Sequence, residues 1–282
     1  MKTIDRRGFI KKVAAVTAAG FIIPETLFAM PAKKTIGIQL YTIRDLVNKD
    51  FEGTLKTLSQ IGYNSVEAAG YSNRKFYNYE PKDYHKICRD YGILPLSSHS
   101  GINSENAETV IEDTVQAGMS YLVLPSIPKE KRQTLDDYRQ LADDFNRIGE
   151  LCNKSGLKFG YHNHAFEFEK IEGQVPYDVL LERTDPDCCF MQVDFYWMVY
   201  GGFDPMDYFR RFPGRFELWH VKDMDSSEQR ESIEIGKGVI DFPGLFKKKK
   251  KAGMKYFFLE QEEFKMDMVE SITMSYKYLT TL

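Results

Sequence analysis

The sequence predicts an α/β fold, a single (β/α)8 TIM barrel that follows an N-terminal export signal. Three observations lead to this prediction. Short apolar runs alternate with helical stretches along the whole chain after residue 32, as in proteins built from β/α units. Eight such units can be placed, and 282 residues suffice for one barrel of about 250 residues. Several His, Asp and Glu residues stand where the apolar runs end, which is where such barrels carry their active sites.

The eight apolar runs have the length and composition of buried parallel strands. We expect these strands at residues 35–41, 65–68, 93–99, 121–124, 157–163, 190–194, 216–222 and 256–260. The intervening helices are expected at residues 51–61, 81–91, 104–117, 135–153, 176–183, 205–212, 242–252 and 268–279. A glycine follows five of these helices as a left-handed terminator, namely Gly62, Gly92, Gly118, Gly156 and Gly253.

An open, doubly wound sheet is the alternative arrangement of β/α units. Dinucleotide-binding proteins of that kind carry a glycine-rich turn after the first strand. Here the chain continues from Leu40 to Asp45 without a glycine, so the closed barrel is preferred.

Residues 1–32 have the pattern of a signal peptide and lie outside the predicted barrel, which occupies residues 33–282. Arg6 and Arg7 precede the apolar stretch Val13–Ile23, and small residues follow it, as in an export signal. The paired arginines resemble a twin-arginine signal, although Asp5 stands where Ser or Thr is usual. The apolar stretch is too short to span a bilayer. We therefore expect a periplasmic protein without a stable membrane anchor; an uncleaved membrane-surface helix is the alternative.

The charge of the chain argues against nucleic acid as a partner. The whole chain carries −3, and removal of residues 1–32 leaves 33 basic and 39 acidic side chains, a net charge of −6. The basic run Lys247–Lys251 falls where a helix should end, a position that lysine favours, so we interpret it as a solvated helix end. The four cysteines show no C-x-x-C spacing and are interpreted as core residues.

The segment Phe159–Phe168 contains the densest group of ligand-type side chains. His162 and His164 stand two residues apart at a strand end, and Glu167 follows three residues later. Residues i and i+2 of a strand face the same side, so both imidazoles can leave the strand together. With Asp194, His220 and Glu260 at later strand ends, these residues predict one divalent-metal site.

The later strand ends supply the other candidate residues. Asp194 follows an apolar strand, where an unpaired carboxylate is costly to bury, so a metal or a helix-capping role is expected. His220 and Lys222 share one strand face, and Glu260 ends a fully apolar strand. Glu67 and His99 are weaker candidates for substrate contact, and Trp197 suits either stacking on a sugar or core packing.

Mixed His, Asp and Glu ligands favour Mn, Zn, Co or Mg over a soft-metal site. Such an ion can bind the vicinal oxygens of a hydroxy-ketone and stabilise the enediolate formed when a C–H proton is removed. A carboxylate or a neighbouring histidine would move that proton.

These residues resemble those of the sugar phosphate isomerase/epimerase family, which has the xylose isomerase-like barrel. The resemblance covers essentially the whole chain after residue 32. It is carried by GIQLYT at 37–42, Gly62 to Glu67, YHNH and Glu167 within 161–168, Asp194 with Trp197, HVKD at 220–223, and Glu260-Gln261.

The resemblance implies metal-assisted proton transfer on a sugar or polyol-derived carbonyl compound. In the family's ketose 3-epimerases the metal is held by a strand-five Glu, a strand-six Asp, a strand-seven His and a strand-eight Glu. Asp194, His220 and Glu260 match the last three. The strand-five position corresponds to His162, with His164 beside it, and this is a departure. Those epimerases use two Glu ligands as an acid/base pair, so the second proton-transfer group here would be His164, Glu167 or Lys222.

The sequence thus favours a metal-dependent sugar isomerase or epimerase with Glu260 as the general base. A metal-dependent lyase or hydratase on 3-keto-glycosides or related keto-sugars is the second reading, because relatives with the His-Asn-His phrase include such members. A third alternative, which is not an enzyme, is a non-catalytic periplasmic sugar-binding barrel. Export favours an unphosphorylated sugar substrate, and the sequence leaves a homo-oligomer open.

Overall fold

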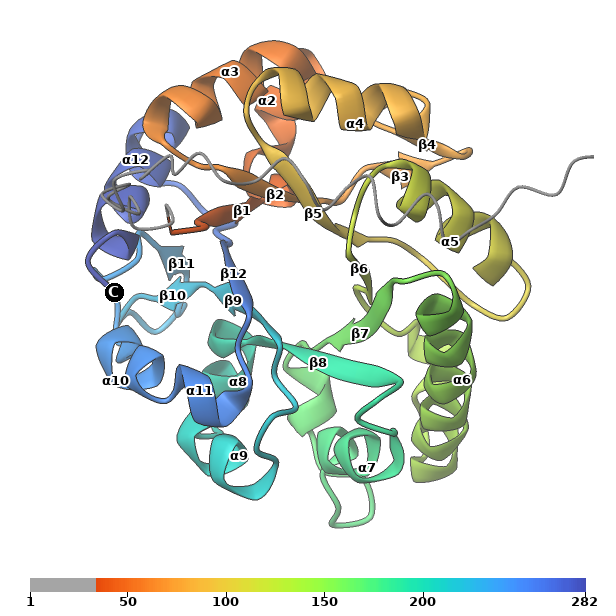
Figure 1. Ribbon diagram of the computed structural model, residues 1–282. Coiled ribbons are helices and arrows are strands. Elements are labelled where there is room, and N and C mark those ends of the chain that lie inside the picture. Colours follow the sequence, from red (N-terminus) through yellow and green to blue (C-terminus); the bar gives the residue numbers. More distant parts are fainter. Residues whose placement is uncertain (1–33) are drawn as a thin grey trace, which may run out of the picture. The chain divides into compact units, whose positions relative to one another are not determined.

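The computed structural model describes residues 34–282, so the export signal expected in residues 1–32 lies outside the described part. Eight parallel strands close into a barrel in the order β1-β12-β9-β8-β7-β6-β5-β2, with helices around the outside (Figure 1). The strands are β1 (Gly37–Gln39), β2 (Ser65–Ala68), β5 (Leu94–His99), β6 (Tyr121–Leu124), β7 (Lys158–His162), β8 (Cys189–Asp194), β9 (Leu218–Val221) and β12 (Tyr256–Leu259). The (β/α)8 prediction is therefore confirmed.

The outer helices fall close to the predicted ranges. They are α3 (Phe51–Ile61), α4 (Pro81–Asp90), α5 (Ala107–Gln116), α6 (Leu135–Lys154), α7 (Pro176–Arg183), α9 (Pro205–Arg211), α10 (Phe242–Lys247) and α12 (Met268–Leu279). The predicted glycine terminators all have positive φ, from 70° at Gly92 to 121° at Gly62. The prediction of a single helix at 242–252 is wrong. The helix is interrupted at Lys248, and a second short helix, α11 (Lys249–Ala252), follows.

Short elements occupy the segments between strands and helices. After β1 come the 3-10 helix η1 (Leu40–Ile43) and α2 (Arg44–Lys49), and α8 (Phe195–Tyr200) follows β8 directly. Two antiparallel hairpins are β3 (Tyr71–Ser72) with β4 (Lys75–Phe76), and β10 (Asp223–Met224) with β11 (Ser232–Ile233). The 3-10 helices η2 (Lys129–Lys131) and η3 (Phe166–Phe168) complete the described elements.

The barrel interior changes from apolar to polar along the strands. A small cluster made of Leu96, Tyr121, Val123, Phe190, Leu218 and Phe258 fills it. On β9, Leu218 belongs to this cluster, and His220, two residues on, shares its face. Gly160 leaves the space that the Phe190 ring occupies. The apolar layer therefore closes the barrel beneath the strand ends and leaves polar residues at its mouth.

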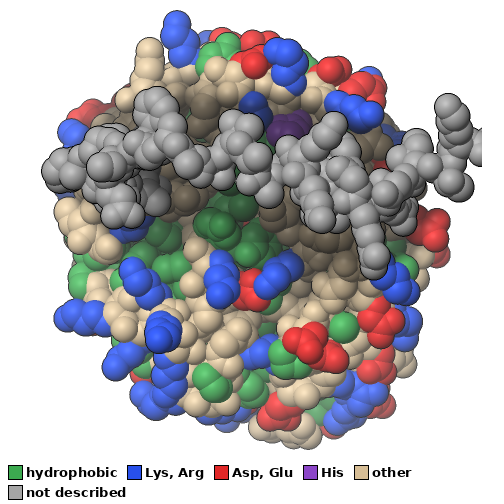
Figure 2. Space-filling model, viewed as in Figure 1, with side chains coloured by type: hydrophobic (Ala, Val, Ile, Leu, Met, Phe, Trp, Pro, Cys, Tyr) green, Lys and Arg blue, Asp and Glu red, His purple; other side chains and the backbone are tan. Residues whose placement is uncertain are grey.

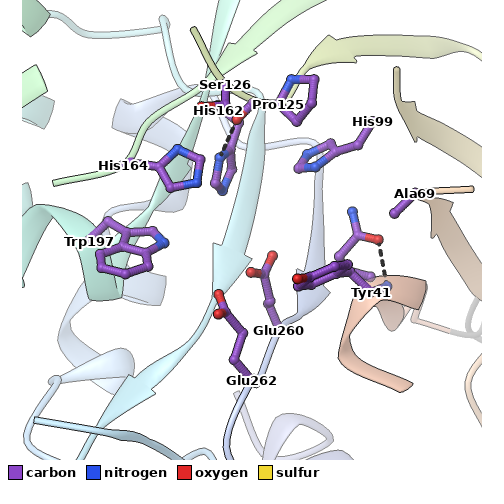
Figure 3. A pocket seen from close by; sticks show the side chains of 11 residues that line it. Tyr41, Ala69, His99, Pro125, Ser126, His162, His164, Trp197, Glu260 and Glu262 are labelled. Carbon is purple, nitrogen blue, oxygen red and sulfur yellow. Dashed lines mark hydrogen bonds between the residues drawn. The ribbon is translucent and has the colours of Figure 1, made fainter. Parts of the chain in front are cut away.

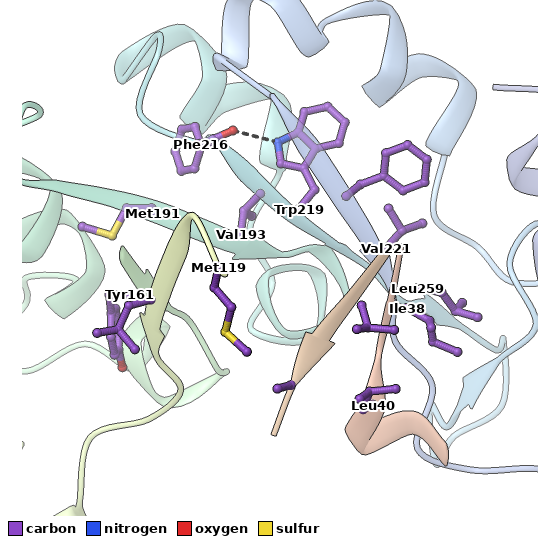
Figure 4. Packing of buried hydrophobic residues seen from close by; sticks show 14 of the residues in the cluster. Ile38, Leu40, Met119, Tyr161, Met191, Val193, Phe216, Trp219, Val221 and Leu259 are labelled. Atoms are coloured by element: carbon purple, nitrogen blue, oxygen red, sulfur yellow. Dashed lines mark hydrogen bonds between the residues drawn. The ribbon is translucent and has the colours of Figure 1, made fainter. Parts of the chain in front are cut away.

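The larger core lies between the strands and the surrounding helices (Figure 4). Trp219 is fully buried there and donates its indole N–H to the carbonyl of Phe216 at 3.1 Å. Trp219 packs outward while its neighbour His220 belongs to the interior, as the two-residue period of a strand requires.

Lys and Arg side chains gather over the region of α10 and α11 on the face shown in Figure 2. All five residues of the run Lys247–Lys251 are exposed, as the solvated-end interpretation expects. The four cysteines are free. Within residues 34–282, no helix combines the length and the apolar character needed to cross a membrane.

Candidate metal centre

Four ligand-type side chains converge at the carboxyl ends of four neighbouring strands. His162 ends β7, Asp194 ends β8, His220 lies in β9 and Glu260 follows β12. One ligand atom from each lies within 4.8 Å of the others, and all four side chains are buried. Since β7, β8, β9 and β12 are consecutive in the barrel, residues almost 100 positions apart meet at one point.

Two of these four residues present a buried polar atom without a hydrogen-bond partner. They are His162 Nε2 and Asp194 Oδ2. His162 Nε2 lies 3.5 Å and His220 Nδ1 3.9 Å from Asp194 Oδ2. Glu260 Oε2 is close to His220 Nδ1. Unpaired buried polar atoms are costly, so a common partner at this point is expected.

In His162, Asp194 and His220, the second polar atom of the side chain contacts another group of the protein. His162 Nδ1 lies 3.3 Å from the carbonyl of Pro125, so an N–H there leaves Nε2 free to ligate. Asp194 Oδ1 accepts the backbone N–H of Trp197 at 2.9 Å and caps α8. His220 Nε2 lies 2.5 Å from Glu67 Oε1. The two readings of Asp194, as cap and as ligand, are thus compatible because each uses a different oxygen.

The arrangement fits a divalent cation. Ligand atoms around a tetrahedral ion with bonds of about 2.1 Å lie roughly 3.4 Å apart, close to the 3.5 and 3.9 Å separations from Asp194 Oδ2. Two imidazoles and two carboxylates suit Zn, Mn, Co or Mg. The carboxylate behind His220 reproduces the outer partner that orients metal-binding histidines.

The charges of the centre are strongly coupled. Burial raises the pKa of Asp194 to about 6, although Lys222 opposes this shift. Burial disfavours the charged form of His220, but Glu260 and Glu67 outweigh it and raise the pKa to about 10. His220 and Lys222 hold the pKa of Glu260 well below its usual range despite burial. In the absence of an ion, the proton on His220 supplies the positive charge between Glu67 and Glu260, and a divalent cation bound at this point would replace that proton.

Glu67 lies behind the metal centre and is fully buried. Its carboxylate accepts hydrogen bonds from Gln39 Nε2 (2.9 Å), Ser97 Oγ (2.6 Å) and Gln192 Nε2 (2.8 Å). Burial opposes its ionisation, but His99 and His220 lower the pKa to about 2. Glu67 is therefore placed to orient His220, and it does not line the cavity.

A cavity of about 350 Å³ opens over the metal centre (Figure 3). Its lining includes Tyr41, His99, His164, Trp197 and Glu262, together with His162 and Glu260. The rings of His164 and Trp197 lie 5.6 Å apart along one wall. Two of the three residues expected to contact substrate, His99 and Trp197, thus lie at the cavity.

His164 faces the cavity as a neutral imidazole. Burial, reinforced by His162, lowers its pKa to about 3. Its Nδ1 is buried without a hydrogen-bond partner. His164 is absent from the four-ligand cluster, so the geometry favours His162 as the ligand and leaves His164 for contact with a bound molecule.

Lys222 is almost fully buried beside Glu260. Its Nζ lies 3.4 Å from Glu260 Oε1 and bonds Glu262. The ammonium also lies 4.8 Å from the ring centres of both Tyr196 and Trp197. Burial opposes its charge, yet Glu260 and Asp194 raise its pKa above the ordinary value. Lys222 is therefore a proton donor or a fixed cation rather than a base.

Glu167 is fully buried and does not line the cavity. Its carboxylate bonds the hydroxyl of Tyr161 and accepts the backbone N–H of His164 at 2.8 Å. The structure thus places Glu167 beneath His164, where it can position that residue.

Several residues of the centre were not among the candidate site residues of the sequence analysis. Gln39 and Gln192 hold the carboxylate of Glu67, and Tyr41 forms part of the cavity wall. Glu262 is two residues beyond Glu260, and that spacing was the one available hint. The search for ligand-type residues at strand ends did not include Tyr41, which follows β1, or Glu262, which follows β12.

The comparison with known families agrees with this fold. The family described as xylose isomerase-like TIM barrel matches residues 55–278. The chain belongs to that family.

The proteins to which this chain is similar include isomerases or epimerases and dehydratases. A sugar phosphate isomerase/epimerase from Parabacteroides distasonis ATCC 8503 superimposes with a TM-score of 0.79 at 30% identity, over 89% of this chain and 95% of that one. An inosose dehydratase from Geobacillus kaustophilus (strain HTA426) is 24% identical over 69% of this chain and 74% of its own length. Inosose dehydratases from two Clostridium perfringens strains match over 42% of their length, at 24% identity.

Proposed function

We propose that this protein is a divalent-metal-dependent isomerase or epimerase that moves a proton on a carbon beside the carbonyl group of a sugar or keto-sugar. The observation that carries the proposal is the convergence of four buried ligand side chains, His162, Asp194, His220 and Glu260, of which His162 Nε2 and Asp194 Oδ2 have no hydrogen-bond partner. They lie under a cavity lined by polar and aromatic side chains.

The proposed ligands are His162, Asp194, His220 and Glu260. A divalent ion there supplies a Lewis acid that polarises a carbonyl or hydroxyl oxygen and so acidifies the neighbouring C–H. Glu67 holds the ring of His220 from behind, and the Pro125 carbonyl does the same for His162.

Glu260 is the proposed general base. It lines the cavity, and its low pKa, maintained by His220 and Lys222 against the effect of burial, keeps it ionised. His164 lines the cavity, and its buried Nδ1 has no hydrogen-bond partner, so it is the proposed group that exchanges a proton on the other side of the substrate. Lys222 is protonated and holds the Glu260 carboxylate in place.

A dehydratase is the second candidate, and a specific observation favours it. The acid/base pair of two ligand carboxylates is incomplete here, because His162 occupies the strand-five position. Glu260 can take the C–H proton and the protonated Lys222 beside it can donate one to the departing hydroxyl, so dehydration does not need a second ligand carboxylate. The inosose dehydratase relatives are consistent with this reaction.

The test uses the protein without residues 1–32, loaded with Mn²⁺ or Zn²⁺ in D₂O. Unphosphorylated ketohexoses and inososes are added, and products are followed by mass spectrometry and NMR. An isomerase or epimerase incorporates solvent deuterium at carbon without other mass change, whereas a dehydratase yields a product lighter by one water. Bound metal and bound sugar without either change would favour a non-catalytic sugar-binding barrel.

Glu260→Gln and Asp194→Asn are the matched variants. Asp194→Asn should lose about one equivalent of metal by mass spectrometry, because the amide can cap α8 but is a poorer ligand. Glu260→Gln, assayed at saturating metal because its amide is also a poorer ligand, should abolish deuterium uptake while most of the sugar binding remains. Deuterium uptake at the wild-type rate in Glu260→Gln would remove Glu260 from the base role.

Export is a separate proposal that rests on residues 1–32. N-terminal sequencing of the protein recovered from periplasm should begin near Ala32. Retention of Met1 in the cytoplasmic fraction would contradict it.

A further inference from the structure

We propose that the cavity selects uncharged sugars and polyols and rejects phosphorylated or carboxylated ones, with Glu262 as the specificity-determining residue. The inference rests on the proposed function for the identity of the cavity, but it concerns binding and not turnover. It assigns a role to a residue that lies outside the metal ligands.

The cavity lacks a free cation. None of the residues that line it, within the part of the chain that the structure describes, is Lys or Arg, whereas Glu260 and Glu262 both are lining residues. Proteins recognise phosphate and carboxylate groups mainly with Arg, Lys and backbone N–H groups. A phosphate in this cavity would therefore meet carboxylates instead of donors with a positive charge.

Lys222 is a cation beside the cavity, and it is already engaged. Its side chain is 1% exposed, and Glu260 and Glu262 both bind its ammonium. The rings of Tyr196 and Trp197 flank the same Nζ. Because the ammonium is enclosed on these sides, an anionic substrate would have to displace a carboxylate in order to reach it.

Glu262 is held in place from the backbone side and open on the carboxylate side. Its N–H donates to Ser232 Oγ at 2.9 Å, and its Oε1 bonds Lys222. Its side chain is 30% exposed. Figure 3 shows the carboxylates of Glu260 and Glu262 directed into the cavity. A carboxylate in this position accepts hydrogen bonds from sugar hydroxyls and repels anions.

At two helix starts beside the cavity, those of η1 and α8, a side chain of the protein already takes a backbone N–H. A helix N-terminus is a common phosphate site because its first N–H groups lack partners. At η1, Gln39 Oε1 accepts the N–H of Tyr41 at 3.0 Å. At α8, Asp194 Oδ1 accepts the N–H of Trp197. In both places a side chain of the protein occupies the position that a phosphate would need.

The net charge of the side chains around the cavity also favours an uncharged ligand. Glu67, Asp194, Glu260 and Glu262 contribute four negative charges, Lys222 contributes one positive charge, and a divalent cation adds two. When the ion takes the place of the proton on His220, the histidines are neutral and these groups sum to one net negative charge. Even with metal bound, the cavity favours a neutral ligand over a dianion.

The experiment compares binding of matched pairs to the metal-loaded protein by isothermal titration calorimetry. The probes are D-fructose with D-fructose 6-phosphate, and myo-inositol with myo-inositol 1-phosphate. We expect the uncharged member of a pair to bind at least tenfold more tightly. Glu262→Gln should reduce this ratio at least threefold, mainly through tighter phosphate binding, because the substitution removes a negative charge and leaves Lys222 less neutralised.

Glu150→Gln is the control, since it removes the same charge from an exposed site on α6 and should leave the ratio unchanged. Equal or tighter phosphate binding by the wild type, or no binding of either member of both pairs, would overturn the inference. An unchanged ratio in both Glu262→Gln and Glu262→Ala would remove Glu262 from the role. If the ratio holds but no sugar is turned over, the proposed reaction fails and the charge selection stands.

Discussion

Glu67 shows how a single buried carboxylate can act on a site that it does not line. Gln39, Ser97 and Gln192 donate to it, and His220 Nε2 contacts the same group. These contacts fix the ring of His220 so that Nδ1 faces the proposed metal position. Partners of this kind increase ligand basicity and restrict ring rotation.

Glu67→Gln should therefore weaken metal binding about 10- to 100-fold while the fold persists. An amide at this position is uncharged and cannot accept all four donors at once. The dissociation constant for Mn²⁺ or Zn²⁺, measured by competition with a chelator, tests this expectation. Ser97→Ala, which removes one neutral donor, is the control with a smaller effect. Wild-type affinity in Glu67→Gln would show that His220 needs no such partner.

Glu167 is a buried carboxylate, and its contribution to the free energy of unfolding depends on pH. Burial raises its pKa to about 7, although Tyr161 and the backbone N–H of His164 partly oppose the shift. The other charged or titratable groups near it are Arg132, Tyr138 and Tyr177. Since the folded-state pKa lies above the ordinary value of 4.5, the folded protein binds this proton more tightly than the unfolded chain. Its contribution therefore lowers stability as pH rises from about 4.5 to 7.

Glu167→Gln should remove this pH-dependent cost. At pH 8 the free energy of unfolding should rise relative to the wild type by up to about 3 kcal/mol, from a shift of roughly two to three pKa units. The difference should vanish about one unit below the ordinary value of 4.5, near pH 3.5, where the carboxyl group is neutral in both states. Urea unfolding at both pH values, in EDTA, measures the difference. A variant less stable than the wild type at pH 8 would show that the charge itself is needed to hold His164.

At the scale of elements, the contact between α6 and β8 depends on one glycine. Gly149 lies in α6, and a Cβ on it would overlap the backbone carbonyl of Cys188, just before β8. Glycine is less favourable than alanine inside a helix by about 1 kcal/mol. Close approach of the helix to the chain leading into the strand is the compensating advantage.

Gly149→Ala should destabilise the protein by about 1–3 kcal/mol, because overpacking outweighs the gain in helix propensity. Gln140→Ala, on an exposed position of the same helix, is the control and should be neutral or slightly stabilising. Thermal or urea unfolding of both variants checks the sign. A stabilised Gly149→Ala would mean that α6 can move away from Cys188 without loss.

The elements that the sequence predicts are those with a strong local signal. The apolar runs and glycine terminators located all eight barrel strands, and β2, β6, α3, α7 and α12 agree to the residue. The β10–β11 hairpin was missed because tertiary contacts hold it: Asp223 accepts the N–H groups of Met224, Gly236, Gly238 and Ile240. The β3–β4 turn uses positive φ at Asn73 and Arg74, residues that give little warning of it.

At the scale of the whole molecule, barrel closure explains which parts of the site the sequence could predict. Parallel strands in a barrel all end at one rim, so His162, Asp194, His220 and Glu260 could be grouped without knowledge of the strand order. Glu262 and Tyr41 follow strand ends, and the path of the loops decides where they point. The roles of Glu67 and Glu167 depended on burial, which spacing alone does not reveal.

The four proposed ligands link four consecutive strands of the closed barrel, so metal binding should stabilise the whole domain. An ion that binds only the folded state at 100 times its dissociation constant adds about 2.7 kcal/mol. For a domain of this size that corresponds to a rise in melting temperature of roughly 5–10 °C. Thermal unfolding in Mn²⁺ and in EDTA measures the shift.

Asp194→Asn should abolish most of this shift, because it removes one ligand oxygen while an amide can keep the cap on α8. In EDTA the variant should be at least as stable as the wild type, since it buries one fewer unpaired carboxylate. Equal melting temperatures of the wild type in metal and in chelator would mean that the four side chains hold no ion. Their unpartnered atoms would then have to be satisfied by water, and the proposed proton transfer would lose its Lewis acid.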